Sequence, residues 1–326
     1  MTPSRLESDM VRTITRGVSF RCDSCWLYGM LHLPPDHVSR HNTGIILLNP
    51  GPTDRSGPHR LYVKLAAMLS AQGYPVLRFD ARGVGDSEGE WSEDLEGATI
   101  LNIWKEIQQG IWIPDTQAGI EFIHREVPEV RRIILGGLCG GAITALLAGA
   151  RHPSVAGLLM MGTPLTLGDR TGNIGSLPNE TIKQETVNFY RKLTSLNAWG
   201  RFLSCRTDLH GIVAVLREHF RRKTLFNGTP PNSQAQLNPA FKESFKAAAH
   251  YGKPMLFVYA EQDYMWHEFK ECFLRHESST APSFDVATIP KANHNMTEDI
   301  WQEQLFGVVT RWMARHFSQD STHTRR

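Results

Sequence analysis

The chain has 326 residues, and its 35 Lys and Arg against 33 Asp and Glu give a formal net charge of +2. That mild balance, without a long basic run interleaved with aromatic residues, argues against a nucleic-acid-binding protein. The first 17 residues are polar, and no stretch approaches the roughly 18 uninterrupted apolar residues of a membrane span, so we expect a cytoplasmic protein.

Strand and helix patterns alternate through the first half of the chain. The expected strands are 13–20, 26–33, 44–48, 75–79, 132–135 and 155–161, and the expected helices are 61–72, 115–126 and 140–150. The first two strands make an antiparallel hairpin, and the rest follow a βαβα order. This order predicts an α/β fold with a doubly wound, mostly parallel sheet, which binds ligands at the carboxyl ends of its strands.

Cys22 and Cys25 form a C-x-x-C pattern between the first two expected strands. No second cysteine pair stands at zinc-ligand spacing, so we interpret the pattern as a hairpin turn and expect neither a metal site nor a cofactor. The odd total of five cysteines favours a reducing compartment over a disulfide framework.

The alternation stops after residue 164 and resumes after residue 250. The intervening segment shows helical patterns at 179–193, 198–203 and 208–223, and later strands are expected at 254–259 and 283–289, with a closing helix at 298–316. We therefore predict a core formed by 1–164 and 251–317, a helical cap at 165–250, and a disordered tail at 318–326.

The sequence Gly-Leu-Cys-Gly-Gly at 137–141 matches the nucleophile-elbow motif G-x-S-x-G with Cys139 in place of serine. A strand pattern precedes it and a helix of small apolar residues follows it. Glycines flank the nucleophile because side chains would collide where the strand turns sharply into the helix. The helix dipole favours a thiolate at this position. The alternative is a small buried core cysteine.

Asp263 and His294 lie where the other members of a triad are expected. The chain order nucleophile, acid, histidine is typical of such an elbow, and the two residues follow the expected strands 254–259 and 283–289. His294 would move the proton and Asp263 would orient it. Glu261 could replace Asp263, which could instead cap a helix, and His267 is the competing histidine.

An oxyanion would need two N–H donors, and we expect Gly140 to supply the first. The second should come from the loop at 49–57, but Pro52 has no N–H. Gly51, Thr53 or a side chain is therefore expected to donate the second hydrogen bond.

With these motifs placed, the chain resembles the α/β-hydrolase superfamily over nearly its full length. The loop at 78–89 resembles the one after the fourth strand in esterase and peptidase members, and we interpret it as a turn held by pairing of Asp80 with Arg82. The Gly51-Pro52 loop, the segment 56–60 and the Gly-Leu-Cys elbow resemble exosortase-system-associated hydrolases. Dienelactone hydrolases share a cysteine at the elbow. The resemblance implies the α/β-hydrolase fold and an acyl-transfer chemistry, without a substrate.

These observations predict a Cys-His-Asp enzyme that acts on an acyl ester or thioester by hydrolysis, acyl transfer or cyclisation. Alternatives are a lactone hydrolase and a non-catalytic binding protein on the same fold. The substrate could be linked to coenzyme A or to a carrier protein. Four cations could receive an acidic carrier, although we favour a solvated helix end whose cations complement the helix dipole: Arg217, Arg221, Arg222 and Lys223.

Overall fold

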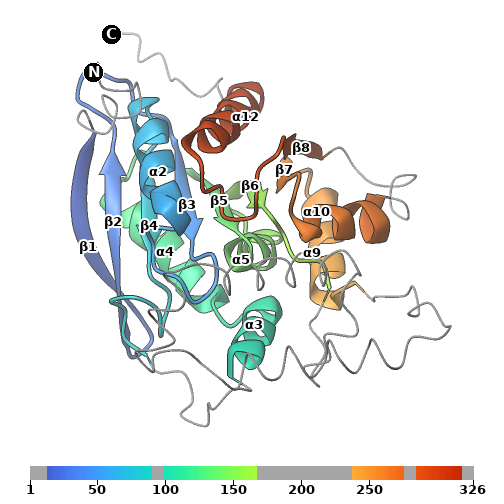
Figure 1. Cartoon of the computed structure of the whole chain (residues 1–326). Helices are drawn as coiled ribbons and strands as arrows, with labels where there is room; N and C mark the ends of the chain where they lie inside the picture. The colour runs from blue at the N-terminus through green and yellow to red at the C-terminus, as the bar shows by residue number, and fades with distance from the viewer. Residues whose placement is uncertain (1–12, 90–98, 167–236, 275–283, 318–326) are drawn as a thin grey trace, which may run out of the picture.

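A computed structural model describes residues 13–89, 99–166, 237–274 and 284–317. Their centre is an eight-stranded sheet in the order β1-β2-β4-β3-β5-β6-β7-β8 (Figure 1). The strands are β1 (Ile14–Cys22), β2 (Cys25–Leu33), β3 (Thr43–Leu48), β4 (Val76–Phe79), β5 (Arg132–Leu138), β6 (Val155–Met161), β7 (Met255–Ala260) and β8 (Asp285–Ile289).

The sheet is parallel from β4 to β8, and only β1 and β2 run antiparallel to their neighbours. Every residue of β3 and β7 is buried, which is why both strands are continuous apolar runs. The carboxyl ends of β5, β7 and β8 therefore share one edge of the sheet, where the elbow and the two predicted triad loops follow them.

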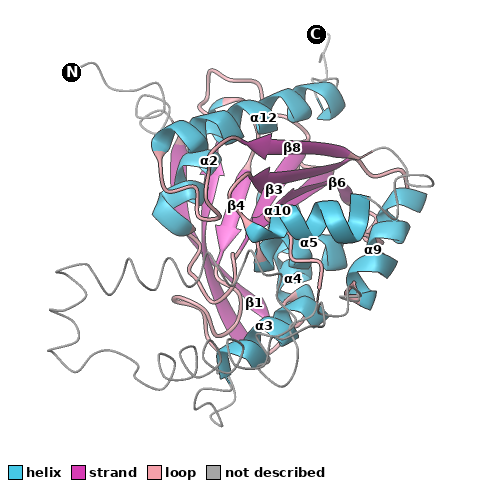
Figure 2. Cartoon of the chain, turned by 45° about the vertical axis from the view of Figure 1, so that its right-hand side comes forward, coloured by secondary structure: helices cyan, strands magenta, loops and turns pink. Residues whose placement is uncertain are grey.

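Helices cover both faces of the sheet. They are α2 (Leu61–Ala71), α3 (Thr99–Gln109), α4 (Ile113–Glu126), α5 (Gly140–Gly149), α9 (Pro239–His250), α10 (Tyr264–Glu268) and α12 (Asp299–Phe317), with a 3-10 turn η1 (Pro58–Arg60) and a π-helical segment η3 (Phe269–Leu274). Helices α2 and α12 lie on one face, and α4, α5 and α9 lie on the other (Figures 1 and 2).

The predicted α/β fold, with its doubly wound and mostly parallel sheet, is confirmed. The hairpin at Cys22 and Cys25 is confirmed as well, since these two residues face each other in the β1–β2 register. β5 continues three residues beyond its predicted end because Gly136 and Gly137, which are poor strand formers alone, are held between β3 and β6.

Three helices were not expected where they lie, namely α3, α9 and the short α10. Helix α3 was missed, and α9 occupies the end of the range predicted as a cap, where it packs against α5. The predicted cap helices at 179–193, 198–203 and 208–223, the four cations near Arg221, and the predicted tail fall outside the described residues. The division into core and cap therefore stays a prediction.

The helices of the described ranges include none with the length and apolar character needed to cross a bilayer. Within the same ranges, no group of three or more His, Cys, Asp or Glu side chains is arranged to hold a metal ion.

Candidate active site

Cys139 occupies a strained turn between β5 and α5. Its φ of 55° and ψ of −112° lie in a region that side-chain-bearing residues rarely adopt. The turn is tight enough that a Cβ on Gly137 would come within 2.7 Å of the Gly141 Cα, and a Cβ on Gly141 would collide with the Leu48 carbonyl. The spacing of the glycines is thus set by steric contact, and it fixes the position of the thiol.

Tyr62 holds the backbone before the elbow in place through hydrogen bonds. Its hydroxyl, on the buried first turn of α2, donates to the Leu48 carbonyl at 2.8 Å and accepts the Leu138 N–H at 2.6 Å. The Cys139 N–H donates to the Met161 carbonyl at 2.8 Å. The backbone before the thiol is therefore tied to the ends of both neighbouring strands, β3 and β6.

His294 and Asp263 come together beside the elbow. The Asp263 carboxylate lies 2.5 Å from His294 Nδ1, and the side chains of Cys139 and His294 are hydrogen-bonded. A Cβ on Gly162 would lie 3.1 Å from His294 Cε1, so this glycine leaves room for the ring. Nδ1 is held by the carboxylate, which leaves Nε2 for the thiol.

The charge of His294 is governed by these two partners. Burial opposes the charged ring, but its hydrogen bonds to Asp263 and Cys139 and its electrostatic interactions with both side chains outweigh that cost and raise the His294 pKa from 6.5 to about 10. His294 is therefore protonated at neutral pH.

Asp263 serves two neighbours at once. One carboxylate oxygen faces His294, and the other accepts the Met265 N–H at 3.1 Å as the N-cap of α10. The N-cap is confirmed, and the contact with His294 is the one that a triad acid would require. Glu261 instead accepts the Lys291 N–H at 2.7 Å, and His267 is exposed on α10.

Two of the three expected oxyanion donors already form hydrogen bonds within the protein. The Gly140 N–H donates to the Pro50 carbonyl at 3.1 Å, and the Thr53 N–H donates to the Gly51 carbonyl at 2.7 Å. The Gly51 N–H donates to none of the described residues. Gly140 and Thr53 are therefore already bonded to carbonyl groups of the loop at 49–57.

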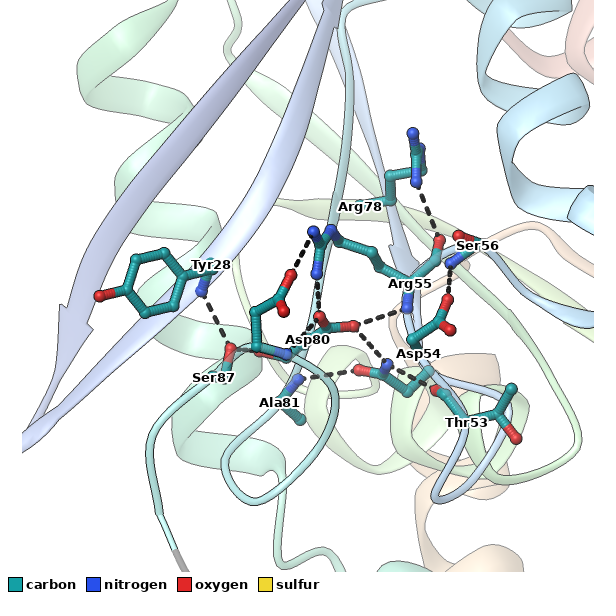
Figure 3. A network of polar contacts seen from close by, with 11 residues as sticks. Tyr28, Thr53, Asp54, Arg55, Ser56, Arg78, Asp80, Ala81 and Ser87 are labelled. Atoms are coloured by element: carbon teal, nitrogen blue, oxygen red, sulfur yellow. Dashed lines mark hydrogen bonds and ion pairs between the residues drawn. The ribbon is translucent and has the colours of Figure 1, made fainter.

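A buried carboxylate fixes that loop from the other side. Asp80 is completely buried, forms an ion pair with Arg55, and accepts the Arg55 backbone N–H at 2.6 Å (Figure 3). The Asn49 amide donates to Asp80 at 3.3 Å and to the Thr53 carbonyl at 2.8 Å. The loop from 49 to 55 is thus anchored at both of its ends.

The predicted pairing of Asp80 with Arg82 is wrong. Arg82 forms an ion pair with the fully buried Asp115 of α4, and its backbone N–H donates to the same carboxylate at 2.8 Å. Asp80 and Arg82 are therefore each paired with a residue outside the loop 78–89. We predicted that Asp80 pairs with Arg82 because the two residues are close in the sequence, and the sequence alone does not show which distant residues meet them in the fold.

Sequence reasoning missed Tyr62, Asn49 and Gly162. The position of Asn49 directly after β3 is a usable signal, because a polar residue at a strand end faces the binding edge. No local pattern distinguishes Tyr62 from an ordinary core residue, since its hydroxyl meets partners that are 14 and 76 residues away.

Comparisons with known proteins agree with this architecture. The model of a hydrolase family described as serine aminopeptidase, S33, matches residues 40–300, a range that includes the elbow, Asp263 and His294. No curated protein sequence matches the chain.

Several solved structures have the same fold at low sequence identity. An esterase from Pyrococcus furiosus is 16% identical with a TM-score of 0.59, over 95% of this chain and 94% of its own. A dienelactone hydrolase from Anabaena variabilis is 13% identical with a TM-score of 0.53, over 94% and 99%. A Butyrivibrio proteoclasticus protein with bound ferulic acid is 16% identical with a TM-score of 0.54, over 93% and 100%. At these identities the likeness shows the fold alone.

Proposed function

Since the chain belongs to the serine aminopeptidase S33 family of hydrolases, we propose that it is a cysteine-dependent enzyme that acts on an acyl ester or thioester. One observation carries this proposal: Cys139 stands at the strained elbow, hydrogen-bonded to His294, which is 2.5 Å from Asp263. Nucleophile, proton carrier and orienting carboxylate are thus in contact in the order that covalent acyl chemistry requires.

In the first step the Cys139 thiolate attacks the substrate carbonyl carbon. A carbon–sulfur bond forms, and the carbonyl electron pair moves to oxygen. When the tetrahedral intermediate collapses, the His294 imidazolium gives its proton to the departing alcohol or thiol, and a thioester acyl-enzyme remains. His294, now neutral, accepts the proton of the incoming nucleophile, and the thiolate is released as the product leaves.

The second nucleophile decides whether the enzyme is a hydrolase or a transferase. A thioester reacts with amines and alcohols as well as with water, so transfer or cyclisation accompanies hydrolysis in the proposal. The acyl donor is free or is linked to coenzyme A or a carrier protein. We also keep the predictions of a cytoplasmic enzyme without a cofactor, of a helical cap at 165–250, and of a kinship with the exosortase-associated group.

The test is turnover of short and long p-nitrophenyl esters and acyl thioesters, with and without an amine acceptor. We expect wild type to release product and Cys139→Ala to fall to the uncatalysed rate, while the ratio of amide to acid separates transferase from hydrolase. Equal turnover by wild type and Cys139→Ala would contradict the proposal.

A lactone hydrolase is the second candidate, because the protein from Anabaena variabilis that shares the fold is named a dienelactone hydrolase. Turnover of an unsaturated lactone at a much higher kcat/KM than any open-chain ester would favour it. The engaged Gly140 N–H favours a third candidate, a non-catalytic binding protein. In that case no substrate in the panel is turned over, and Cys139→Ala leaves ligand affinity unchanged.

A further inference from the structure

The Pro50 carbonyl occupies the place in which a substrate oxyanion would be needed. It accepts the N–H of Gly140, the residue that directly follows the proposed nucleophile and begins α5. The first N–H groups of a helix have no partner within the helix, and they bind a carbonyl or an anion equally well. While Pro50 holds this bond, the Gly140 N–H cannot stabilise a tetrahedral intermediate.

We propose that the Pro50–Gly51 peptide flips during the reaction, which frees the Gly140 N–H and turns the Gly51 N–H toward the substrate oxygen as the second oxyanion donor. This inference rests on the proposed function. The flip exchanges the direction of one C=O and one N–H, so a single rotation removes the blocking acceptor and supplies the missing donor.

The backbone at these two residues permits the rotation. A peptide flip changes ψ of the first residue and φ of the second by about 180°, and proline restricts only its own φ. Gly51 has φ of 141°, which only glycine tolerates well, and the flip takes it to roughly −40°, a value open to all residues. Gly51 is also close to the site, because a Cβ on Gly140 would lie 3.2 Å from the Gly51 nitrogen.

The flanking residues stay fixed while the peptide turns. Leu48 is held by the Tyr62 hydroxyl, and Asn49 accepts the Ala81 N–H at 2.9 Å while it donates to the Thr53 carbonyl at 2.8 Å. Trp104 of α3 packs over Gly51, where an added Cβ would come within 2.9 Å of the Trp104 ring atom Cζ2. The peptide that turns thus lies in a short stretch between two anchored residues, Asn49 and Thr53.

The test observes the two amides directly. The sequence contains a single Pro-Gly pair, at 50–51, and a single Cys-Gly pair, at 139–140. Carbonyl-labelled proline or cysteine combined with ¹⁵N-glycine therefore isolates each amide signal in the full chain. The probe is [1-¹³C]butanal, to which a nucleophilic Cys139 adds to give a hemithioacetal. A carbon–sulfur bond forms, the carbonyl π bond breaks, and the aldehyde oxygen takes up the thiol proton and becomes the hydroxyl of a tetrahedral carbon.

We expect the hemithioacetal carbon signal in wild type and not in Cys139→Ala. With the adduct formed, the Gly51 amide proton should move downfield and exchange with solvent more slowly, because it gains an acceptor. If the adduct forms and the Gly51 amide proton keeps its chemical shift and its rate of exchange with solvent, the proposed peptide flip is wrong, whereas the assignment of Cys139 as the nucleophile is supported. If no adduct forms on Cys139, both the assignment of Cys139 as the nucleophile and the proposed oxyanion donors are overturned.

Kinetics give an independent readout that allows for the contact with Trp104. In a Trp104→Ala background, where the ring no longer crowds residue 51, Gly51→Pro removes the N–H and should lower kcat about 10²- to 10³-fold with little change in KM. Gly51→Ala in the same background keeps the N–H and should restore most of the lost kcat. Equal kcat for Trp104→Ala with and without Gly51→Pro would overturn the assignment.

Discussion

His294 is charged at neutral pH because its ring interacts with the side chains of Asp263 and Cys139. Its pKa of about 10 is the outcome of Asp263 and Cys139 acting against the cost of burial. The resting site therefore holds His294 in its protonated form at neutral pH.

The raised pKa makes a prediction for stability. Because the folded pKa exceeds the ordinary 6.5, protonated His294 stabilises the folded state fully below pH 6.5, and this contribution is lost as the pH rises through about 10. The difference in unfolding free energy between wild type and His294→Gln should shrink by on the order of 1–3 kcal/mol from pH 6 to pH 10. Urea unfolding at both pH values measures it, and a constant or growing difference would contradict the charge assignment.

Asp263 can be separated from Glu261 by paired substitutions. Asp263→Asn keeps an oxygen for the Met265 N–H but offers His294 an amide, which favours the wrong tautomer, so kcat should fall about 10²- to 10⁴-fold with little loss of stability. Asp263→Ala loses the cap too and should cost about 1 kcal/mol more in unfolding free energy. Glu261→Gln is the matched control, and a loss of kcat there as large as in Asp263→Asn would reverse the assignment.

At the scale of elements, Tyr62 ties α2 to the ends of β3 and β5. Its hydroxyl bonds to the Leu48 carbonyl and the Leu138 N–H, both of which are buried. Leu48 directly precedes the loop at 49–57, and Leu138 directly precedes Cys139. The relative position of the two loops is therefore set by one side chain.

Tyr62→Phe should leave both backbone groups without a partner and lower the unfolding free energy by about 1–3 kcal/mol. We expect kcat to fall while KM changes little, because the loops shift relative to each other. Thermal unfolding and steady-state kinetics measure the two effects. Tyr28→Phe, on an exposed tyrosine, is the control, and the prediction fails if the two variants are indistinguishable.

The elements were predictable where pattern and burial coincide. The apolar runs of β3, β6 and β7 specify strands, and strand ends alone locate Asp263 and His294. The bond from Gly140 to Pro50 was not predictable, because backbone orientation in a loop rich in Pro and Gly leaves no trace in side-chain periodicity. The pairing of Asp80 with Arg55, 25 residues away, depends on contacts that only the folded chain defines.

At the scale of the whole molecule, Asp80 joins the loop after β3 to the loop after β4. Its carboxylate is inaccessible to solvent, whereas Asp86, which pairs with the same Arg55, has a side chain that is 69% exposed. A buried charge that loses its partner is costly, while an exposed pair contributes little. Because Arg55 pairs with both carboxylates, the buried pair with Asp80 can be compared directly with the exposed pair with Asp86.

Arg55→Met leaves the buried Asp80 carboxylate without its ion-pair partner, and we expect the unfolding free energy to fall by about 3–5 kcal/mol. Asp86→Asn should change it by less than about 1 kcal/mol. Chemical denaturation of the two variants beside wild type is the measurement. Similar small effects from both would show that Asp80 does not depend on Arg55.

The most direct test of a cysteine-dependent acyl enzyme is rapid-quench intact-mass analysis of the protein mixed with p-nitrophenyl butyrate. The account predicts one added butyryl group on wild type, mapped to Cys139 by peptide sequencing, which forms and decays at rates that support turnover, and none on Cys139→Ala. Turnover without a Cys139 adduct, or an adduct that forms equally on Cys139→Ala, would contradict it.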